Sequence, residues 1–392
     1  MKNTVITGIS RTPIGSFLGS LKGISATELG AFAIEGALKN AELSPDAIDE
    51  VYFGQVLQGG SGQAPARQAA LGAGLLNKTP CTTVNKVCGS GLKAVMLAKD
   101  AIALGDAQVV VAGGMESMSN APFALMNARS GFHRGDQKVV DLMLHDGLID
   151  PYQRLHMGNF GDDTALKYGI SRSEQDEYAM ASYQKALEAA DKGFFDKEIT
   201  PIKVKNKNTE ELIKEDEEPK NYKPLKIPHL NPSFKKEGTI TAANASKIND
   251  GAAALILMSE EEAKNRNLKI NAKILSSASF AADPAWFTTA PIQAIKKALD
   301  QTSLKIADVD IFEINEAFSV VPMLIGRELN ISERKINIFG GAVALGHPIG
   351  CSGARILVTL INAMSIKGFR IGCAAICLGG GEALAMIVER EG

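Results

Sequence analysis

Short apolar runs and longer segments with helical spacing alternate along this chain. Val5 to Ile9 is an apolar run with the length of a buried strand. Between Thr27 and Ala41 the apolar residues recur at helical spacing, and after a Ser-Pro-Asp turn a second strand is predicted from Ile48 to Phe53. This order of strand, helix and strand predicts an α/β architecture.

The next elements lead into and out of a cysteine. A strand is predicted from Thr82 to Val87, directly before Cys88, and a helix from Leu92 to Leu104. Val109 to Ala112 is a fully apolar strand that ends in two glycines. Residues 54–74 are rich in glycine and alanine, which predicts a close-packed connection and not a flexible linker.

Much of this pattern returns in the second half of the chain. Ile34 to Leu38 matches Ile295 to Leu299, and with one residue of slippage Ser90 and its glycine match Ser352 and its glycine. Each copy continues into a helix, a glycine turn, an apolar strand and another glycine cluster. The constant order predicts a duplication. We therefore expect two similar α/β domains, with mostly parallel sheets, packed face to face.

The middle of the chain belongs to neither copy. It contains an amphipathic helix predicted from Ser173 to Asp191, and then a stretch rich in Lys, Glu and Pro from Lys203 to Lys236. That stretch is either a solvated surface loop or a lobe that holds cationic groups over a pocket. The expected division is a first half at 1–118 and 250–270, an inserted loop domain at 119–249, and a second half at 271–392.

Composition narrows the functional classes. With 45% hydrophobic and 22% charged residues and a net charge of −2, the chain is typical of a globular protein without a basic surface for nucleic acid or membrane. No apolar run reaches the length that spans a bilayer, and the first residues enter a strand, which leaves no room for a signal peptide. The five cysteines show no paired metal-binding spacing. We expect a cytoplasmic protein without a metal site.

Cys88 is the first candidate for chemistry. Gly89 and Gly91 allow a sharp turn between the predicted strand and helix. A thiol at a helix N-terminus is close to the positive end of the helix dipole and to free N–H groups, which would lower its pKa and make it a nucleophile. The alternative is a buried structural cysteine.

Three other reactive side chains also follow predicted strands or precede a predicted helix. His347 lies among glycines before a helix, Cys377 ends the strand from Ala374 to Ile376, and Asn315 follows the strand from Val309 to Ile314. A thiol with a His partner is a nucleophile and base pair. A second thiol suits removal of a proton beside a carbonyl, and glycine runs offer N–H groups to an oxyanion. Together they indicate acyl transfer with formation or cleavage of a carbon–carbon bond.

These segments resemble a known family. Four blocks of the chain resemble the four signature blocks of the thiolases: Asn85-Lys86-Val87-Cys88-Gly89-Ser90-Gly91, Asn315-Glu316-Ala317-Phe318, Gly346-His347-Pro348 and Cys377-Leu378-Gly379-Gly380-Gly381. The resemblance extends over the whole chain and includes Arg11-Thr12-Pro13, the run from Gly113 to Met118, and Asn244-Ala245-Ser246.

The resemblance implies a fold and a division of roles. The fold would be two duplicated βαβαβαββ halves in a five-layer arrangement with an inserted loop domain, assembled as a dimer or a dimer of dimers. Cys88 would carry the acyl group. His347 would activate it and, with a water held by Asn315, stabilise the thioester oxygen. Cys377 would remove the α-proton of the second acyl-CoA, and the N–H groups of Cys88 and Gly379 would form the other oxyanion hole.

The resemblance also implies how coenzyme A (CoA) is bound. Ser246 would contact the pantetheine arm, and the cationic loop would hold the ADP phosphates, with Lys220 as the candidate contact. The other pocket residues implied are His156, Met157, Phe318 and Leu148. CoA and acyl-CoA are substrates, and no cofactor or metal is needed because the thioester itself acidifies the α-carbon.

Met157 favours the biosynthetic branch, which joins two acetyl-CoA molecules into acetoacetyl-CoA or runs in reverse. One departure from this pattern is Lys247, where the family often has glycine. The alternative is a degradative 3-ketoacyl-CoA thiolase of fatty-acid β-oxidation with a broader chain length. A lipid carrier without catalysis would lack a catalytic residue, and a ketosynthase would pair its cysteine with two histidines. Both are disfavoured.

Overall fold

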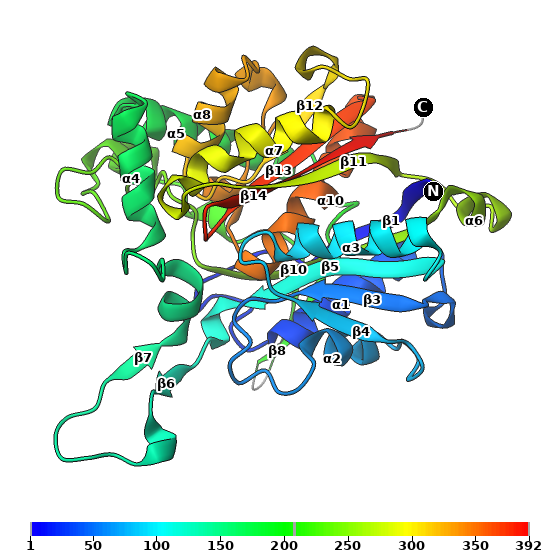
Figure 1. Ribbon diagram of the computed structural model, residues 1–392, viewed down its shortest axis with the longest axis horizontal. Coiled ribbons are helices and arrows are strands. Elements are labelled where there is room, and N and C mark those ends of the chain that lie inside the picture. Colours follow the sequence, from blue (N-terminus) through cyan, green and yellow to red (C-terminus); the bar gives the residue numbers. More distant parts are fainter. Residues whose placement is uncertain (1, 207–208, 391–392) are drawn as a thin grey trace.

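Two sheet layers, each built by one half of the chain and joined edge to edge into one ten-stranded sheet, enclose a central pair of helices in the computed structural model, which describes residues 2–206 and 209–390 (Figure 1). The first-half strands are β1 (Thr4–Arg11), β3 (Glu50–Gly54), β4 (Cys81–Val84), β5 (Val109–Ser117) and β10 (Asn249–Ser259), with the two-residue β2 (Gly15–Ser16) paired to β10. Helices α1 (Ala26–Asn40) and α2 (Pro65–Gly72) cover the outer face, and α3 (Ser90–Leu104) covers the inner face.

The second half repeats this plan. Its strands are β11 (Ala272–Ala281), β12 (Ile311–Ile314), β13 (Ile371–Leu378) and β14 (Glu382–Glu389), and a single bridge from Phe312 to Ile336 takes the place of β4. Helices α7 (Ala290–Leu299) and α8 (Val320–Glu328) lie outside, and α10 (Ile349–Lys367) lies inside against strands of both halves. The two halves show the same strand order, so the predicted duplication and five layers are confirmed.

The sheets are mixed, and the prediction of mostly parallel sheets is wrong. Among the strands of the described residues, the parallel pairs are β3 with β4, β3 with β5, and β12 with β13. The other pairs are antiparallel, since β14 follows β13 after a three-glycine turn and β10 returns from the insertion. Strands β1 and β11 link the halves at their edges through only two residue pairs, Val5 with Lys273 and Ile6 with Ala272.

Close helix packing holds the two halves together. A Cβ on Gly91 of α3 would lie 2.7 Å from the backbone nitrogen of Ala354, and a Cβ on Gly353 of α10 would lie 2.6 Å from that of Leu92. Glycine is therefore required on both helices where they meet. Among the described residues, α10 alone has the length and apolar character of a membrane span, and it is buried inside the protein as a core helix.

One local prediction needs correction. Gly113 and Gly114 lie inside β5 and do not end it; a Cβ on Gly114 would lie 2.1 Å from the carbonyl oxygen of Gly350, so this glycine permits close packing. The connection at 54–74 is close-packed as predicted, and it contains helix α2, which begins at a proline and packs on α1.

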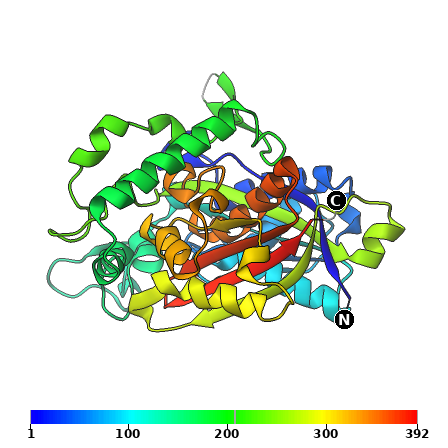
Figure 2. The ribbon, with the colours of Figure 1, turned by 90° about the horizontal axis from the view of Figure 1, so that it is seen from above.

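The insertion lies along one side of the two sheets (Figure 2). Its predicted helix is confirmed as α5 (Arg172–Asp191). Its other elements are β6 (Phe123–Leu125), β7 (Val139–Asp141), η4 (Met143–Leu148), α4 (Met157–Lys167), β8 (Ile202–Asn206), β9 (Thr209–Ile213), η5 (Glu218–Asn221) and η6 (Pro224–His229). The remaining short helices are η1 (Pro45–Ala47), η2 (Met118–Asn120), η3 (Ala128–Ser130), α6 (Glu260–Asn265), η7 (Pro284–Thr289), η8 (Ile306–Asp308), η9 (Glu333–Lys335) and α9 (Ala342–Leu345).

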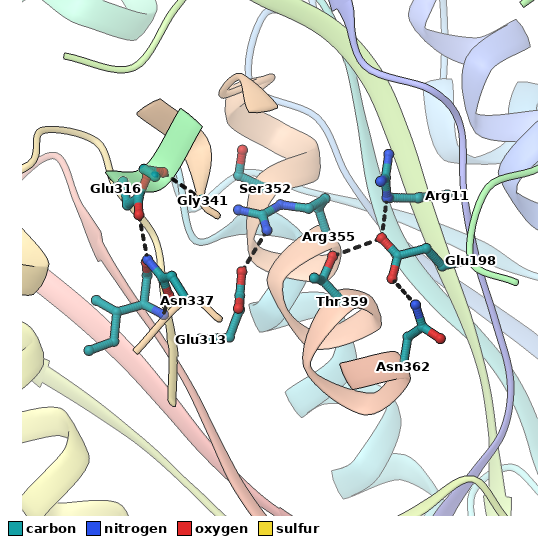
Figure 3. Close-up of polar contacts among 12 residues, drawn as sticks. Arg11, Glu198, Glu313, Glu316, Asn337, Gly341, Ser352, Arg355, Thr359 and Asn362 are labelled. Carbon is teal, nitrogen blue, oxygen red and sulfur yellow. Dashed lines mark hydrogen bonds and ion pairs between the residues drawn. The ribbon is translucent and has the colours of Figure 1, made fainter. Parts of the chain in front are cut away.

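A buried arginine fastens the insertion to the core (Figure 3). Arg11 of β1 is fully buried and donates to Glu198 at 2.6 Å and, through both terminal nitrogens, to Asp216 at 2.6 and 2.9 Å. Glu198 also accepts hydrogen bonds from Thr359 and Asn362 of α10. The insertion, β1 and the central helix therefore share one buried polar cluster.

We expect Arg11→Met to lower the free energy of unfolding by about 3–5 kcal/mol, because it leaves two buried carboxylates without their cation. Chemical denaturation would measure the change. The control is Arg370→Met, which removes an exposed ion pair to Glu389 and should cost less than about 1 kcal/mol. Equal effects of the two substitutions would contradict the anchoring role of Arg11.

Candidate active site

A largely apolar pocket of about 510 Å³ opens where both halves and the insertion meet. Most of the predicted site residues line it: Cys88, Leu148, His156, Met157, Ser246, Phe318, His347, Cys377 and Gly379. Asn315 is fully buried beside His347, and Lys220 does not line the pocket, although the next residue, Asn221, does. The structure thus gathers side chains that are far apart in the sequence.

A strained turn presents Cys88. Val87 has a φ of 46°, a left-handed conformation that a β-branched residue rarely adopts. Ser90 holds this turn: its hydroxyl donates to the carbonyl of Val87 at 2.7 Å and accepts from the N–H of Lys86 at 2.8 Å. Helix α3 begins directly after the turn, at Ser90.

The expected low pKa of Cys88 is wrong. Burial raises the pKa of this thiol to about 12 and outweighs the hydrogen bonds from the N–H groups of Gly379 and of Cys88 itself, which lower it. Nevertheless, these two N–H groups point at the sulfur. They belong to the two residues predicted to form an oxyanion hole, and that role stays a prediction.

A hydrogen-bond chain fixes the tautomer of His347. Ser352 donates its hydroxyl proton to the carbonyl of Pro348 at 2.8 Å and can therefore only accept from Nδ1 of His347, 2.5 Å away. Nδ1 thus carries the proton, and Nε2 is the free base. The side-chain Nδ2 of Asn315 lies 3.4 Å from that Nε2. The water predicted at Asn315 stays a prediction.

His347 is neutral at physiological pH. Burial, and to a lesser extent the positive charge of Arg355, lower its pKa to about 3. Arg355 itself is buried and paired with Glu313 at 2.8 Å (Figure 3). Since the thiol of Cys88 is also neutral, the resting pair is a thiol and an imidazole.

Cys377 ends strand β13 and faces the same pocket. Burial is the main cause that raises the pKa of the Cys377 thiol, and the nearby Cys88 raises it by a smaller amount. Its thiolate is therefore a strong base, as removal of a proton from carbon requires. All five cysteines are free thiols. In the described part of the chain, no group of three or more His, Cys, Asp or Glu side chains is arranged to hold a metal ion.

Apolar side chains form the pocket wall beside the cysteines. Met157 begins helix α4, and His156 caps this helix by accepting the N–H of Gly158 at 3.2 Å. The ring of His156 stacks on Phe234 at 4.6 Å, and Phe234 contacts Phe318 edge-on at 6.1 Å. The wall is therefore packed and leaves a limited volume for an acyl group.

Lys220 does not contact the pocket. Its side chain is 63% exposed and pairs with Glu215 at 2.8 Å. The cation that does line the pocket is Lys247, beside Ser246. Sequence reasoning noted Lys247 only as a departure from a family pattern, since its contacts come from segments far away in the chain.

Two other residues were missed by sequence reasoning. The sequence contained a sign of the role of Ser352, because the repeat aligns it with Ser90. Each of the two hydroxyls donates to a backbone carbonyl in the turn beside a candidate catalytic residue. Glu116 is buried at the end of β5 and accepts the N–H groups of Val56, Leu57 and Gly350. It thereby holds the start of α10 beside the pocket.

Comparisons with known proteins show the family of this chain. Residues 4–261 match the family described as thiolase, N-terminal domain, and residues 268–390 match thiolase, C-terminal domain. The chain is 50% identical to a mitochondrial acetyl-CoA acetyltransferase of Mus musculus, covering 100% of this chain and 92% of that protein. It is 47% identical to an acetyl-CoA acetyltransferase of Pseudomonas aeruginosa, with 100% of both chains covered.

A solved structure is similar over its full length. The Acat5 thiolase from Ascaris suum, in complex with coenzyme A, superposes with a TM-score of 0.95 at 43% identity, covering 100% of both chains. Both family matches, the full-length similarity and the shared fold show that the chain belongs to the thiolase family.

Proposed function

We propose that this protein is an acetyl-CoA C-acetyltransferase, which reversibly condenses two acetyl-CoA molecules into acetoacetyl-CoA and CoA. The observation that carries the proposal is one pocket that contains Cys88, His347, Cys377 and the closing side chain Met157. Relatives of 45–50% identity over the full chain that bear this name support it.

In the first half-reaction, the sulfur of Cys88 attacks the carbonyl carbon of acetyl-CoA while Nε2 of His347 takes the thiol proton. The N–H groups of Cys88 and Gly379 stabilise the negative charge on the oxygen. The carbon–sulfur bond to CoA breaks, and His347 returns the proton to the departing thiolate. The products are acetylated Cys88 and free CoA.

In the second half-reaction, Nε2 of His347 first takes the thiol proton of Cys377, and the resulting thiolate takes a proton from the α-carbon of a second acetyl-CoA. The carbanion attacks the acetyl carbonyl on Cys88, the bond from that carbon to the Cys88 sulfur breaks, and the departing Cys88 thiolate takes the proton held by His347. Asn315 and His347 lie together where they can stabilise the thioester oxygen of this second substrate. No cofactor is required, because the thioester acidifies the α-carbon.

The assembly and location are also proposed. The arm that carries β6 and β7 exposes Phe123 (66%), Phe132 (51%) and Val139 (60%), an apolar surface of the kind that is covered in an oligomer. We propose a homo-oligomer, a dimer or dimer of dimers, in the cytoplasm. Ser246 contacts the pantetheine arm of CoA. Lys220 stays the candidate contact for the ADP phosphates, since its exposed ammonium lies between Glu218 and Asn221 in the sequence, and both of these residues line the pocket.

The two cysteines should separate the two half-reactions. We expect Cys88→Ala to abolish labelling of the protein by radioactive acetyl-CoA, and Cys377→Ala to retain labelling while losing condensation by at least about a hundredfold. The control is Cys373→Ala, a buried change on the same strand outside the pocket. Loss of labelling in Cys377→Ala would contradict the division of roles.

Ser352→Ala should lower kcat about fivefold to tenfold, because it removes a hydrogen bond worth about 1 kcal/mol that fixes the His347 tautomer. Steady-state thiolysis of acetoacetyl-CoA would measure the loss. Ser276→Ala is the matched control, since it deletes a buried hydroxyl that donates to the carbonyl of Ala298 away from the pocket. An equal fall of kcat in both variants would refute the role of Ser352.

Met157 should set the chain length. The wild-type protein should prefer acetoacetyl-CoA over the six-carbon 3-ketoacyl-CoA, and Met157→Ala should shift the ratio of their kcat/KM values at least about tenfold toward the longer substrate. Met323→Ala, a partly buried change on α8, should leave the ratio unchanged. Comparable wild-type rates for all lengths would assign the protein to the degradative branch instead.

A further inference from the structure

Lys247 is a charged side chain inside a largely apolar pocket. It follows Ser246 directly, two residues before β10 begins, and its side chain is half-buried. Its ammonium donates to the carbonyl oxygens of Ala245 at 2.7 Å and Val343 at 3.3 Å. Neither half-reaction described above uses this group.

The surroundings of this ammonium are electron-rich on several sides. The ring of Tyr183, from α5, lies 5.7 Å from Nζ, and the carboxylates of Glu218 and Glu316 favour the charged form. Burial acts in the opposite direction and lowers the pKa of Lys247 to about 8. Carbonyls, an aromatic face and carboxylates together make a cage suited to a cation.

The contact with Val343 gives a hydrogen-bond donor to a backbone carbonyl that the turn before His347 leaves without one. In a continuing helix the carbonyl of Val343 would accept the N–H of His347, four residues later. Helix α9 instead breaks at Gly346, whose φ is 108°, and the N–H of His347 donates to Asn249 at 2.9 Å. The turn that aims His347 therefore leaves this carbonyl to another donor. Lys247 is the side chain that supplies it.

The same ammonium joins two functional segments. On one side is the carbonyl of Ala245, in the segment whose Ser246 donates its N–H to Ala317 at 3.0 Å at the pocket wall. On the other side is α9, whose Val343 N–H is held by Glu316 at 3.0 Å and which leads into His347. A single side chain thus ties the CoA-binding segment to the loop of the general base.

We propose that Lys247 is a positioning residue: its ammonium donates to the carbonyl left unpaired at the end of α9 and thereby fixes the position of His347 relative to the segment that contains Ser246. A test of this proposal by thiolysis activity rests on the proposed function, so a second measurement that needs no acyl-CoA is used beside it. The rate at which iodoacetamide alkylates Cys88, followed by peptide mapping, reports the position of His347 without any acyl-CoA.

Lys247→Ala should lower kcat/KM for acetoacetyl-CoA thiolysis about tenfold and slow Cys88 alkylation, because the end of α9 loses its charged donor. Millimolar methylammonium chloride should restore both rates, since this cation fits the space and offers the same donors. Tetramethylammonium chloride at equal ionic strength should restore neither, because it has no N–H.

Lys247→Met is the matched variant: it should show the same loss but no rescue, because its side chain fills the space. Lys192→Met, an exposed change at the end of α5, should behave as the wild-type protein.

Wild-type rates in either Lys247 variant, or a loss in Lys247→Ala that methylammonium fails to reverse, would overturn the proposal. If Lys247→Ala does not fold, normal rates in the Met variant still overturn it. A wild-type protein inactive on acetoacetyl-CoA would refute the proposed function and leave the alkylation test intact.

Discussion

The close contact between α3 and α10 is the constraint on which the rest of the structure depends. Gly91 and Gly353 each face backbone of the other helix, with no room for a Cβ. Both helices begin at the pocket, so their contact fixes how far apart Cys88 and His347 lie. The duplicated halves thus become one catalytic unit through a helix pair, while their sheets meet at only two residue pairs.

The duplication also explains how two different catalytic groups are held by similar means. Ser90 and Ser352 occupy matching positions at the start of α3 and α10, and each hydroxyl donates to a carbonyl three or four residues earlier. In the first half the hydroxyl stabilises the strained turn at Val87, and in the second half it orients His347. One structural device therefore positions a nucleophile in one copy and a base in the other.

Burial sets the chemistry of this pair. A thiolate and an imidazolium would each lose hydration in the apolar pocket, so both groups rest in their neutral forms. Charge develops only during attack, where the N–H groups of Cys88 and Gly379 can stabilise it. Charges that are present at rest, on Arg11, Arg355 and Lys247, are held by carboxylates or carbonyls outside the reacting centre.

The sequence by itself determined the repeated α/β plan and the strands and helices beside the reactive residues, because periodicity and spacing are local properties; thiolase chemistry came from the resemblance of four sequence blocks to that family. The predicted helix before Asp191 and the placement of Cys377 at the end of a strand show this. Tertiary structure decided what depends on distant segments. It made the sheets mixed, and it raised the pKa of Cys88 through burial that a helix terminus alone does not reveal. It also brought Lys247 into the pocket and against the carbonyl of Val343, since a side chain's partners are chosen by packing and not by its neighbours in sequence.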